Sequence, residues 1–175
     1  MLKCFMYKIV YFLVFGLCMN TFLYAKEPYL AILDNVVSNE IQEFHTVSYS
    51  FICKPYGVLS IEELYDNSKL DSVCRKSIYT FYEKYPTSRY YAQKILRVQQ
   101  MYHIEFKNRE CILYALGEKT LSELLVENGL AVVKPIFKDE EFRYLFFEAQ
   151  MRAKVGKHGL WREKITNKCI EEVYK

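Results

Sequence analysis

The strongest candidate for chemistry in this sequence is Arg109, in the basic segment 107–109 between two stretches that are typical of strands. An arginine in a turn presents a planar guanidinium group, which binds phosphate oxygens through two parallel hydrogen bonds. From these residues alone, the favoured interpretation of Arg109 is an ordinary surface charge in contact with solvent. A site for a phosphate group is the alternative.

The other residue types that often do chemistry form no second pattern of this kind. His45, His103 and His158 are far apart and lack the spacing of metal ligands. The 6 glycines are scattered singly, so they cannot form a phosphate-binding loop. Nothing in the sequence predicts a nucleotide cofactor, a haem or a zinc-dependent mechanism.

Four of the 6 cysteines lie after residue 25, at positions 53, 74, 111 and 169. They lack the paired short spacing of zinc knuckles. In an oxidising compartment they would form two disulfides in one of three pairings, and the sequence does not choose among them. Buried free thiols are the alternative.

Composition limits the class of protein that this chain belongs to. The chain has 175 residues, of which 51% are hydrophobic, 17% aromatic and 26% charged, and its net charge is +3. These values exclude a wholly disordered chain and a protein that coats polyanions through a large excess of basic residues. A single globular domain over residues 26–175 is expected.

Residues 1–25 have the layout of a secretory signal peptide. Lys3 and Lys8 are their only charges, the apolar run 9–19 follows, and Ala25 is a small residue suited to cleavage. The run is shorter than a membrane-spanning helix needs, so a retained anchor is the weaker interpretation, as is a lipoprotein at Cys18. We expect export to the periplasm or beyond the cell, and a mature chain without a membrane span.

The elements that must position Arg109 alternate between strands and helices. Period-two patterns and turn residues predict strands, and apolar residues at helical spacing predict helices. The expected strands are 29–37, 44–53, 101–106, 110–116 and 130–133, and the expected helices are two within 60–96, divided at Pro86, then 119–128 and 138–155.

One part of the chain resembles a known family. The segment from Lys119 to Trp161 is similar to the C-terminal half of the staphylococcal nuclease family. It contains, in the same order, a helix with Ser-Glu-Leu-Leu, the sequence Gly-Leu-Ala, a helix with Glu-Ala-Gln and a final Gly-Leu-Trp. The resemblance implies an α+β fold, with a five-stranded OB-type barrel and packed helices. Trp161 itself is expected to be an apolar plug rather than a catalytic residue.

The resemblance also implies a site. Counting back from Ser122 and Glu123 places Arg109 at the family's catalytic arginine, and counting back from Pro55 makes Asp34 the only matched ligand of the family's calcium ion. Asp34 as an ordinary turn acid is the alternative. The same count puts Cys53 at a calcium-binding aspartate, Tyr56 at the general base and Ser48 at a second arginine, so three roles are unfilled.

These substitutions predict a catalytically degenerate module that binds nucleic acid or another partner. Cysteine does not suit calcium, and a phenol is a poor base at neutral pH. Single-stranded DNA or RNA is the expected partner, and a monomer is the expected state. The alternative is an active calcium-dependent phosphodiesterase whose acids come from non-matching positions such as Glu62, Glu63 and Asp66, and a third hypothesis is an interaction scaffold.

Overall fold

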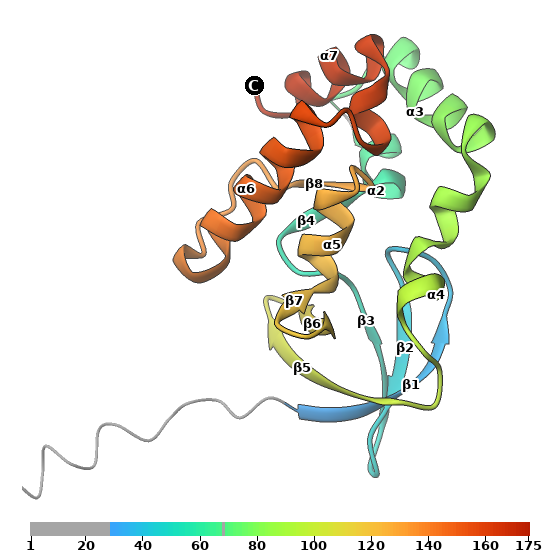
Figure 1. Cartoon of the computed structure of the whole chain (residues 1–175), viewed down its shortest axis with the longest axis vertical. Coiled ribbons are helices and arrows are strands. Elements are labelled where there is room, and N and C mark those ends of the chain that lie inside the picture. Colours follow the sequence, from blue (N-terminus) through green and yellow to red (C-terminus); the bar gives the residue numbers. More distant parts are fainter. Residues whose placement is uncertain (1–28, 68) are drawn as a thin grey trace, which may run out of the picture.

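The computed structural model describes residues 29–67 and 69–175, without the side chain of residue 165. The predicted signal peptide, residues 1–25, lies outside the described residues, as do Cys4 and Cys18. Figure 1 shows six of the strands gathered at one end of the molecule, most of the helices at the other, and β4 and β8 between them.

The main sheet has six strands in the order β3-β2-β1-β5-β6-β7, and every pair of neighbours is antiparallel. The central strand is β1, in which Ile32 pairs with His45 on one side and with Met101 on the other. A second sheet pairs β4 with β8. The strands are β1 Tyr29–Val36, β2 Gln42–His45, β3 Ser50–Cys53, β4 Val58–Ser60, β5 Met101–Lys107, β6 Glu110–Leu116, β7 Lys119–Thr120 and β8 Ala131–Val133.

Side-chain caps begin several of the helices. Ser60 and Glu63 form a capping box at the start of α2, and Thr120 and Asp139 cap α5 and α6. The helical segments are α2 Ile61–Tyr65, α3 Ser72–Lys84, η1 Pro86–Tyr90, α4 Tyr91–Ile95, α5 Leu121–Glu127, α6 Glu140–Val155, η2 Gly159–Arg162 and α7 Lys164–Val173. In the view of Figure 1, α5 lies between α6 and α4.

The stretch 44–53, predicted as one strand, is wrong in that form because it contains a hairpin. β2 ends at His45, and the backbone N–H of Thr46 donates to the carbonyl of Tyr49 at 2.8 Å, which closes a turn before β3. This turn contains no glycine or proline, the residues that usually mark one in a sequence. The strands on either side of segment 107–109 are confirmed.

One continuous core joins the sheet to the helices. Leu33 and Phe44 from the sheet, Leu125 from α5 and Phe146 from α6 are fully buried. Trp161 in η2 is 3% exposed and belongs to the same core, in keeping with its expected role as an apolar plug.

A short parallel bridge joins the segment after β3 to β6. The N–H of Tyr56 donates to the carbonyl of Cys111 at 3.0 Å, and the N–H of Cys111 donates to the carbonyl of Lys54 at 2.8 Å. The α+β class is confirmed. The strand order is that of an open sheet, so closure into a five-stranded barrel stays a prediction.

The four cysteines form two disulfides. Cys53 is bonded to Cys111 beside the parallel bridge, and Cys74 in α3 is bonded to Cys169 in α7. One of the three pairings left open by the sequence is thereby selected. Among the described residues, no helix has both the length and the apolar character needed to cross a membrane.

Candidate functional site

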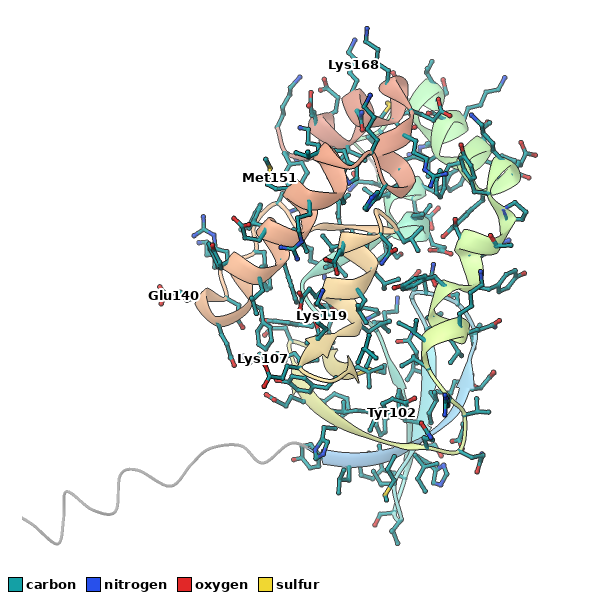
Figure 2. The ribbon with its side chains drawn as sticks, viewed as in Figure 1. Tyr102, Lys107, Lys119, Glu140, Met151 and Lys168 are labelled. Atoms are coloured by element: carbon teal, nitrogen blue, oxygen red, sulfur yellow. A yellow bond between two sulfur atoms is a disulfide. The ribbon has the colours of Figure 1, made fainter. Side chains whose placement is uncertain are left out.

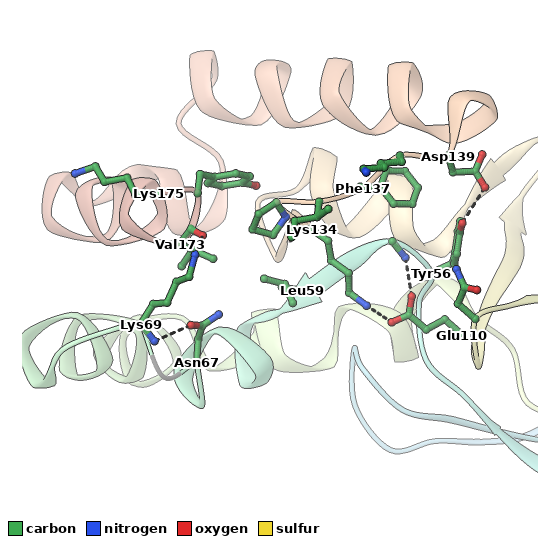
Figure 3. A pocket seen from close by; sticks show the side chains of 16 residues that line it. Tyr56, Leu59, Asn67, Lys69, Glu110, Lys134, Phe137, Asp139, Val173 and Lys175 are labelled. Atoms are coloured by element: carbon green, nitrogen blue, oxygen red, sulfur yellow. Dashed lines mark hydrogen bonds and ion pairs between the residues drawn. The ribbon is translucent and has the colours of Figure 1, made fainter.

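A groove of about 900 Å³ lies next to the turn that contains Arg109. We call it the groove. Figure 3 shows it between the β4 and β6 strands on one side and α6 and α7 on the other. Its lining comes from five segments: Tyr56 to Leu59, Asn67 with Lys69, Asn108 with Glu110, residues 134–139, and residues 173–175.

Arg109 lies at the rim of the groove rather than in its lining: its neighbours Asn108 and Glu110 line the groove, and Arg109 itself does not. Asn108 and Arg109 form the two-residue turn between β5 and β6, with φ angles of 52° and 65°. Such a turn needs a left-handed backbone at both positions, which asparagine tolerates and arginine does not favour. Arg109 is exposed, and its side chain has no hydrogen-bond or ion-pair partner among the described residues.

Tyr56, the residue at the family's general-base position, is a hydrogen-bond donor here. Its hydroxyl donates to Oδ2 of Asp139 at 2.8 Å, as Figure 3 shows. Burial and this hydrogen bond raise the pKa of Tyr56 to about 12. A phenol with that pKa is protonated at neutral pH, so Tyr56 cannot activate water by removing a proton.

Lys107 completes a cluster around Asp139. Its ammonium group donates to Asp139 and to Glu141, at 3.1 Å in each case, and lies 5.0 Å from the centre of the Phe142 ring. Figure 2 shows Lys107 beside the start of α6, where Glu140 is labelled. Burial opposes ionisation of Asp139, but the hydrogen bonds from Tyr56 and Lys107 outweigh it, so the pKa of Asp139 is lowered.

A second pair of charges crosses the floor of the groove. Lys134 forms an ion pair with Oε1 of Glu110, and the N–H of Gly57 donates to Oε2 of the same carboxylate at 3.1 Å. Gly57 has a φ of 73°, and an added Cβ would lie 2.4 Å from the ring of Phe137. Glycine is therefore required at this turn for both its backbone conformation and its small size.

The electrostatic balance of the groove is positive. Its lining contains four lysines and only two carboxylates, Glu110 and Asp139, and both carboxylates already have lysine partners. Among the described residues, Lys138 has no carboxylate partner, and the Lys69 ammonium donates to the carbonyl of Val173. Lys175 is paired with Glu172, which lies outside the lining, at 2.6 Å. The four lysines are Lys69, Lys134, Lys138 and Lys175.

Asp34 and Arg109 are not brought together. Asp34 follows Leu33, which is hydrogen-bonded to Gln99 and Gln100 just before β5, whereas Arg109 follows the end of β5. Seven residues in β5 separate the two ends by about 20 Å, because a strand rises about 3.3 Å per residue. Oδ1 of Asp34 instead lies 2.7 Å from Nδ1 of His45.

The other positions that the family resemblance singled out are occupied by structural contacts or lie elsewhere. Cys53 is held in its disulfide, and Ser48 is exposed in the turn between β2 and β3. Glu63 belongs to the α2 capping box, and Glu62 accepts a hydrogen bond from the Tyr82 hydroxyl at 3.0 Å. Asp66 is the C-terminal cap residue of α2, and neither it nor Glu62 nor Glu63 lines the groove.

Sequence reasoning missed a buried polar cluster around Glu40. Its carboxylate, 9% exposed, is bonded to the Lys54 ammonium at 2.6 Å and to the Ser60 hydroxyl at 3.1 Å. The hydrogen bond to Glu40 outweighs burial and raises the pKa of Lys54. No local pattern marks this cluster in the sequence, because its members come from three separate segments.

Among the described residues, no group of three or more His, Cys, Asp and Glu side chains is placed to hold a metal ion.

Fold and site together define an α+β domain with a positively charged groove beside an exposed arginine. No family model matches the chain, and no curated protein matches its sequence. The relation to the staphylococcal nuclease family therefore stays a prediction that rests on the residues between Lys119 and Trp161.

Proposed function

We propose that this protein is a nuclease-like module that binds single-stranded nucleic acid in the groove and does not cleave it. The observation that carries the proposal is the unpaired guanidinium of Arg109 at the rim of a groove whose lining is rich in lysine. Arginine and lysine at a groove attract a phosphodiester backbone, and arginine adds bidentate hydrogen bonds to its oxygens.

The size and lining of the groove support a ligand on the scale of a nucleotide. Its volume of about 900 Å³ falls in the range of small-molecule sites, about 300–1,000 Å³. Phe137, which is partly exposed, lines it and adds apolar surface against which a base can pack, although its ring is already stacked on Phe146.

The backbone strain at Arg109 supports a functional role for this side chain. A residue other than glycine in the left-handed region costs about 1–3 kcal/mol and tends to persist where function requires it. With φ at 65°, Arg109 occupies a turn position at which glycine would be more stable.

The residues at the family's catalytic positions favour binding over cleavage. The Tyr56 hydroxyl keeps its proton and donates a hydrogen bond to Asp139, and the Cys53 sulfur is bonded to Cys111. Neither side chain can act as a general base or as an oxygen ligand for calcium. The competing proposal, a calcium-dependent phosphodiesterase, needs acids near Arg109, but Glu110 is paired with Lys134 and Asp34 lies beyond the other end of β5.

We further propose that the main sheet forms an OB-type barrel. The parallel bridge between Pro55 and Cys111 supports this, because it brings the segment after β3 against β6 and so returns the sheet toward itself. Export of the protein to an oxidising compartment is supported by the two disulfides.

The test measures binding of a fluorescent single-stranded oligonucleotide to the purified protein and to two arginine variants. Arg109→Gln should weaken binding about tenfold, because it removes one charge-assisted contact. Arg97→Gln is the matched control, since Arg97 is also exposed but precedes β5 and lies at the other end of that strand from Arg109. It should change binding by less than about twofold.

Salt and calcium complete the test. Binding should weaken steeply as salt is raised, since phosphate contacts release counterions. The oligonucleotide should remain intact with calcium and with a chelator. Equal effects of the two arginine variants would overturn the groove as the binding site, and calcium-dependent cleavage that Arg109→Gln abolishes would replace this proposal with the phosphodiesterase.

A further inference from the structure

A second pocket, separate from the groove, lies where η1 and α4 meet the end of α5 and η2. Its volume is about 160 Å³, and it shares no lining residue with the groove. In the view of Figure 1, α4 lies on the side of α5 opposite to α6, which borders the groove. The lining residues that bear polar hydrogen-bond donors include Ser88, Tyr91, Lys94, Asn128 and Arg162.

Arg162 is held in place without being neutralised. Its guanidinium carbon lies 4.9 Å from the centre of the Tyr85 ring, a distance at which the cation is attracted to the ring face. No carboxylate is paired with Arg162 among the described residues, and the adjacent Glu163 is bonded to Lys84 instead. The donor groups of Arg162 are therefore oriented by Tyr85 and remain available to a ligand.

Tyr91 supplies a donor that the protein leaves unused. The amide nitrogen of Asn128 donates to the carbonyl of Leu124 at 2.8 Å and to the Tyr91 hydroxyl at 2.9 Å. Because the Leu124 carbonyl can only accept, this nitrogen is the NH₂ group, and the Tyr91 oxygen acts as an acceptor. The hydroxyl proton of Tyr91 has no acceptor among the described residues, and burial raises the pKa of Tyr91, so the proton is retained at neutral pH.

The remaining lining fits an anion better than a cation. Lys94 is exposed without a carboxylate partner in the described part of the chain, and no aspartate or glutamate lines the pocket. The hydroxyls of Thr87 and Ser88 add two further donors. A volume of about 160 Å³ is well below the 300 Å³ or so at which sites for whole small molecules begin.

We propose that this pocket, built from Arg162, Lys94 and Tyr91, binds a single phosphoryl group. The group is either free phosphate or the terminal phosphate of a larger molecule that extends into solvent. The site is independent of the groove, so its existence does not depend on the function proposed above.

Calorimetric titration of the purified protein tests the proposal at constant ionic strength. Three probes are used: inorganic phosphate, a thymidine dinucleotide with a 5′-phosphate, and the same dinucleotide without it. We expect phosphate or the 5′-phosphorylated dinucleotide to bind with a Kd of about 1 mM or below. Preference for inorganic phosphate identifies a free anion as the ligand, and preference for the phosphorylated dinucleotide identifies a terminal phosphate.

Three variants separate this pocket from general charge effects. Arg162→Gln should weaken binding about tenfold, and Tyr91→Phe, which keeps the ring and removes only the donor, should weaken it about threefold. Arg89→Gln is the control, because Arg89 is an exposed arginine that lies over the Tyr82 ring and does not line the pocket. Thermal melting establishes that each variant is folded.

The outcomes are distinct from those for the groove. Arg109→Gln should leave binding of inorganic phosphate unchanged. It should also leave unchanged the ratio between the affinities of the two dinucleotides, which differ only in the 5′-phosphate. Arg162→Gln should leave oligonucleotide binding in the groove unchanged. The proposal is overturned if no phosphate probe binds, or if Arg89→Gln weakens binding as much as Arg162→Gln. It is also overturned if Tyr91→Phe is folded and binds as the unmodified protein does.

Discussion

The hydroxyl of Tyr56 lies 2.8 Å from Oδ2 of Asp139, although 83 positions separate the two residues in the chain. This hydrogen bond joins the turn after β3 to the first turn of α6, and Lys107 joins β5 to the same carboxylate. The Asp139 carboxylate therefore connects three elements beside the groove: the turn after β3, β5 and the start of α6. Oδ2 of Asp139 accepts both of these bonds, and Oδ1 accepts the Glu141 N–H at 3.0 Å. Because both oxygens are engaged, the carboxylate serves the shape of the groove rather than proton transfer.

The disulfide between Cys53 and Cys111 should support both stability and the groove. Replacing both cysteines with serine should lower the free energy of unfolding by about 2–4 kcal/mol, because the unfolded chain regains a loop of 58 residues. It should also weaken oligonucleotide binding, since Cys111 follows Glu110 and the bridge beside it positions Tyr56. Denaturant unfolding and oligonucleotide titration measure the two effects.

The disulfide between Cys74 and Cys169 is the matched control. It closes a loop of 95 residues but joins α3 to α7. Its removal should cost a similar 2–4 kcal/mol or so. It should weaken oligonucleotide binding less than loss of the Cys53 bond does, because α7 contributes only residues 173–175 to the groove, at the end opposite to Glu110 in Figure 3. Equal loss of binding in both double variants would show that the bond at Cys53 has no particular role in the groove.

Gly57 should tolerate substitution less well than another glycine with the same kind of backbone. Gly57→Ala places a Cβ 2.4 Å from the Phe137 ring, whereas Gly117→Ala, at a φ of 60°, meets nothing within 4 Å. Both variants bear the cost of a left-handed alanine, about 1–2 kcal/mol, and Gly57→Ala adds about 1–3 kcal/mol of overpacking. Denaturant unfolding of the two variants compares them, and equal losses would mean that Phe137 moves aside freely.

Local signals in the sequence predicted many of the elements, but not all of them and not the contacts between them. The turn at Asn108 and Arg109 was predictable because a polar pair separates two strand-like stretches, and α6 because its apolar residues recur at helical spacing. α7 was not predicted, although Thr166, Cys169, Ile170 and Val173 are buried at helical spacing and would have indicated it.

The contacts that shape the site depend on residues far apart in the sequence. Glu40 is paired with Lys54, and Glu110 with Lys134, only after the strands that carry them have assembled. No periodicity or turn residue marks such a pair. Arg109 could be chosen as a phosphate-binding candidate from the sequence around it. Its separation from Asp34 could not be foreseen, because that distance depends on how the strands assemble.

The raised pKa of Glu63 should make the free energy of unfolding fall as the pH rises. The lowered pKa of Asp139 acts in the opposite direction. Burial raises the pKa of Glu63, the Ser60 N–H opposes the rise, and nearby Glu40 adds to it, while Lys54 and Lys134 lower it. A raised pKa in the folded state means that the stabilising contribution is present at acidic pH and is lost as the pH rises through the folded pKa. Glu63→Gln keeps an acceptor for the Ser60 N–H, so it should gain stability relative to the unmodified protein as the pH rises.

Urea unfolding at about pH 4 and about pH 7 measures this difference. The control is Glu118→Gln, since Glu118 is exposed in the turn before β7 and has no partner among the described residues. Its stability relative to the unmodified protein should be the same at both pH values. A Glu63→Gln variant that loses stability at neutral pH would show that the carboxylate charge stabilises the capping box.

Arg109→Gly should make the protein more stable and a weaker binder at the same time. Glycine adopts a φ near 65° without strain, so the substitution should raise the free energy of unfolding by about 1 kcal/mol. It also removes the only unpaired guanidinium that we find at the rim of the groove among the described residues, so oligonucleotide binding should fall about tenfold.

Asn108→Gly is the control: it relaxes the neighbouring turn position, at a φ of 52°, and keeps the arginine. If Arg109→Gly were stabilising and left binding intact, the strained arginine would have no role in the groove. If it were destabilising, the side chain would make a contact that outweighs its backbone strain.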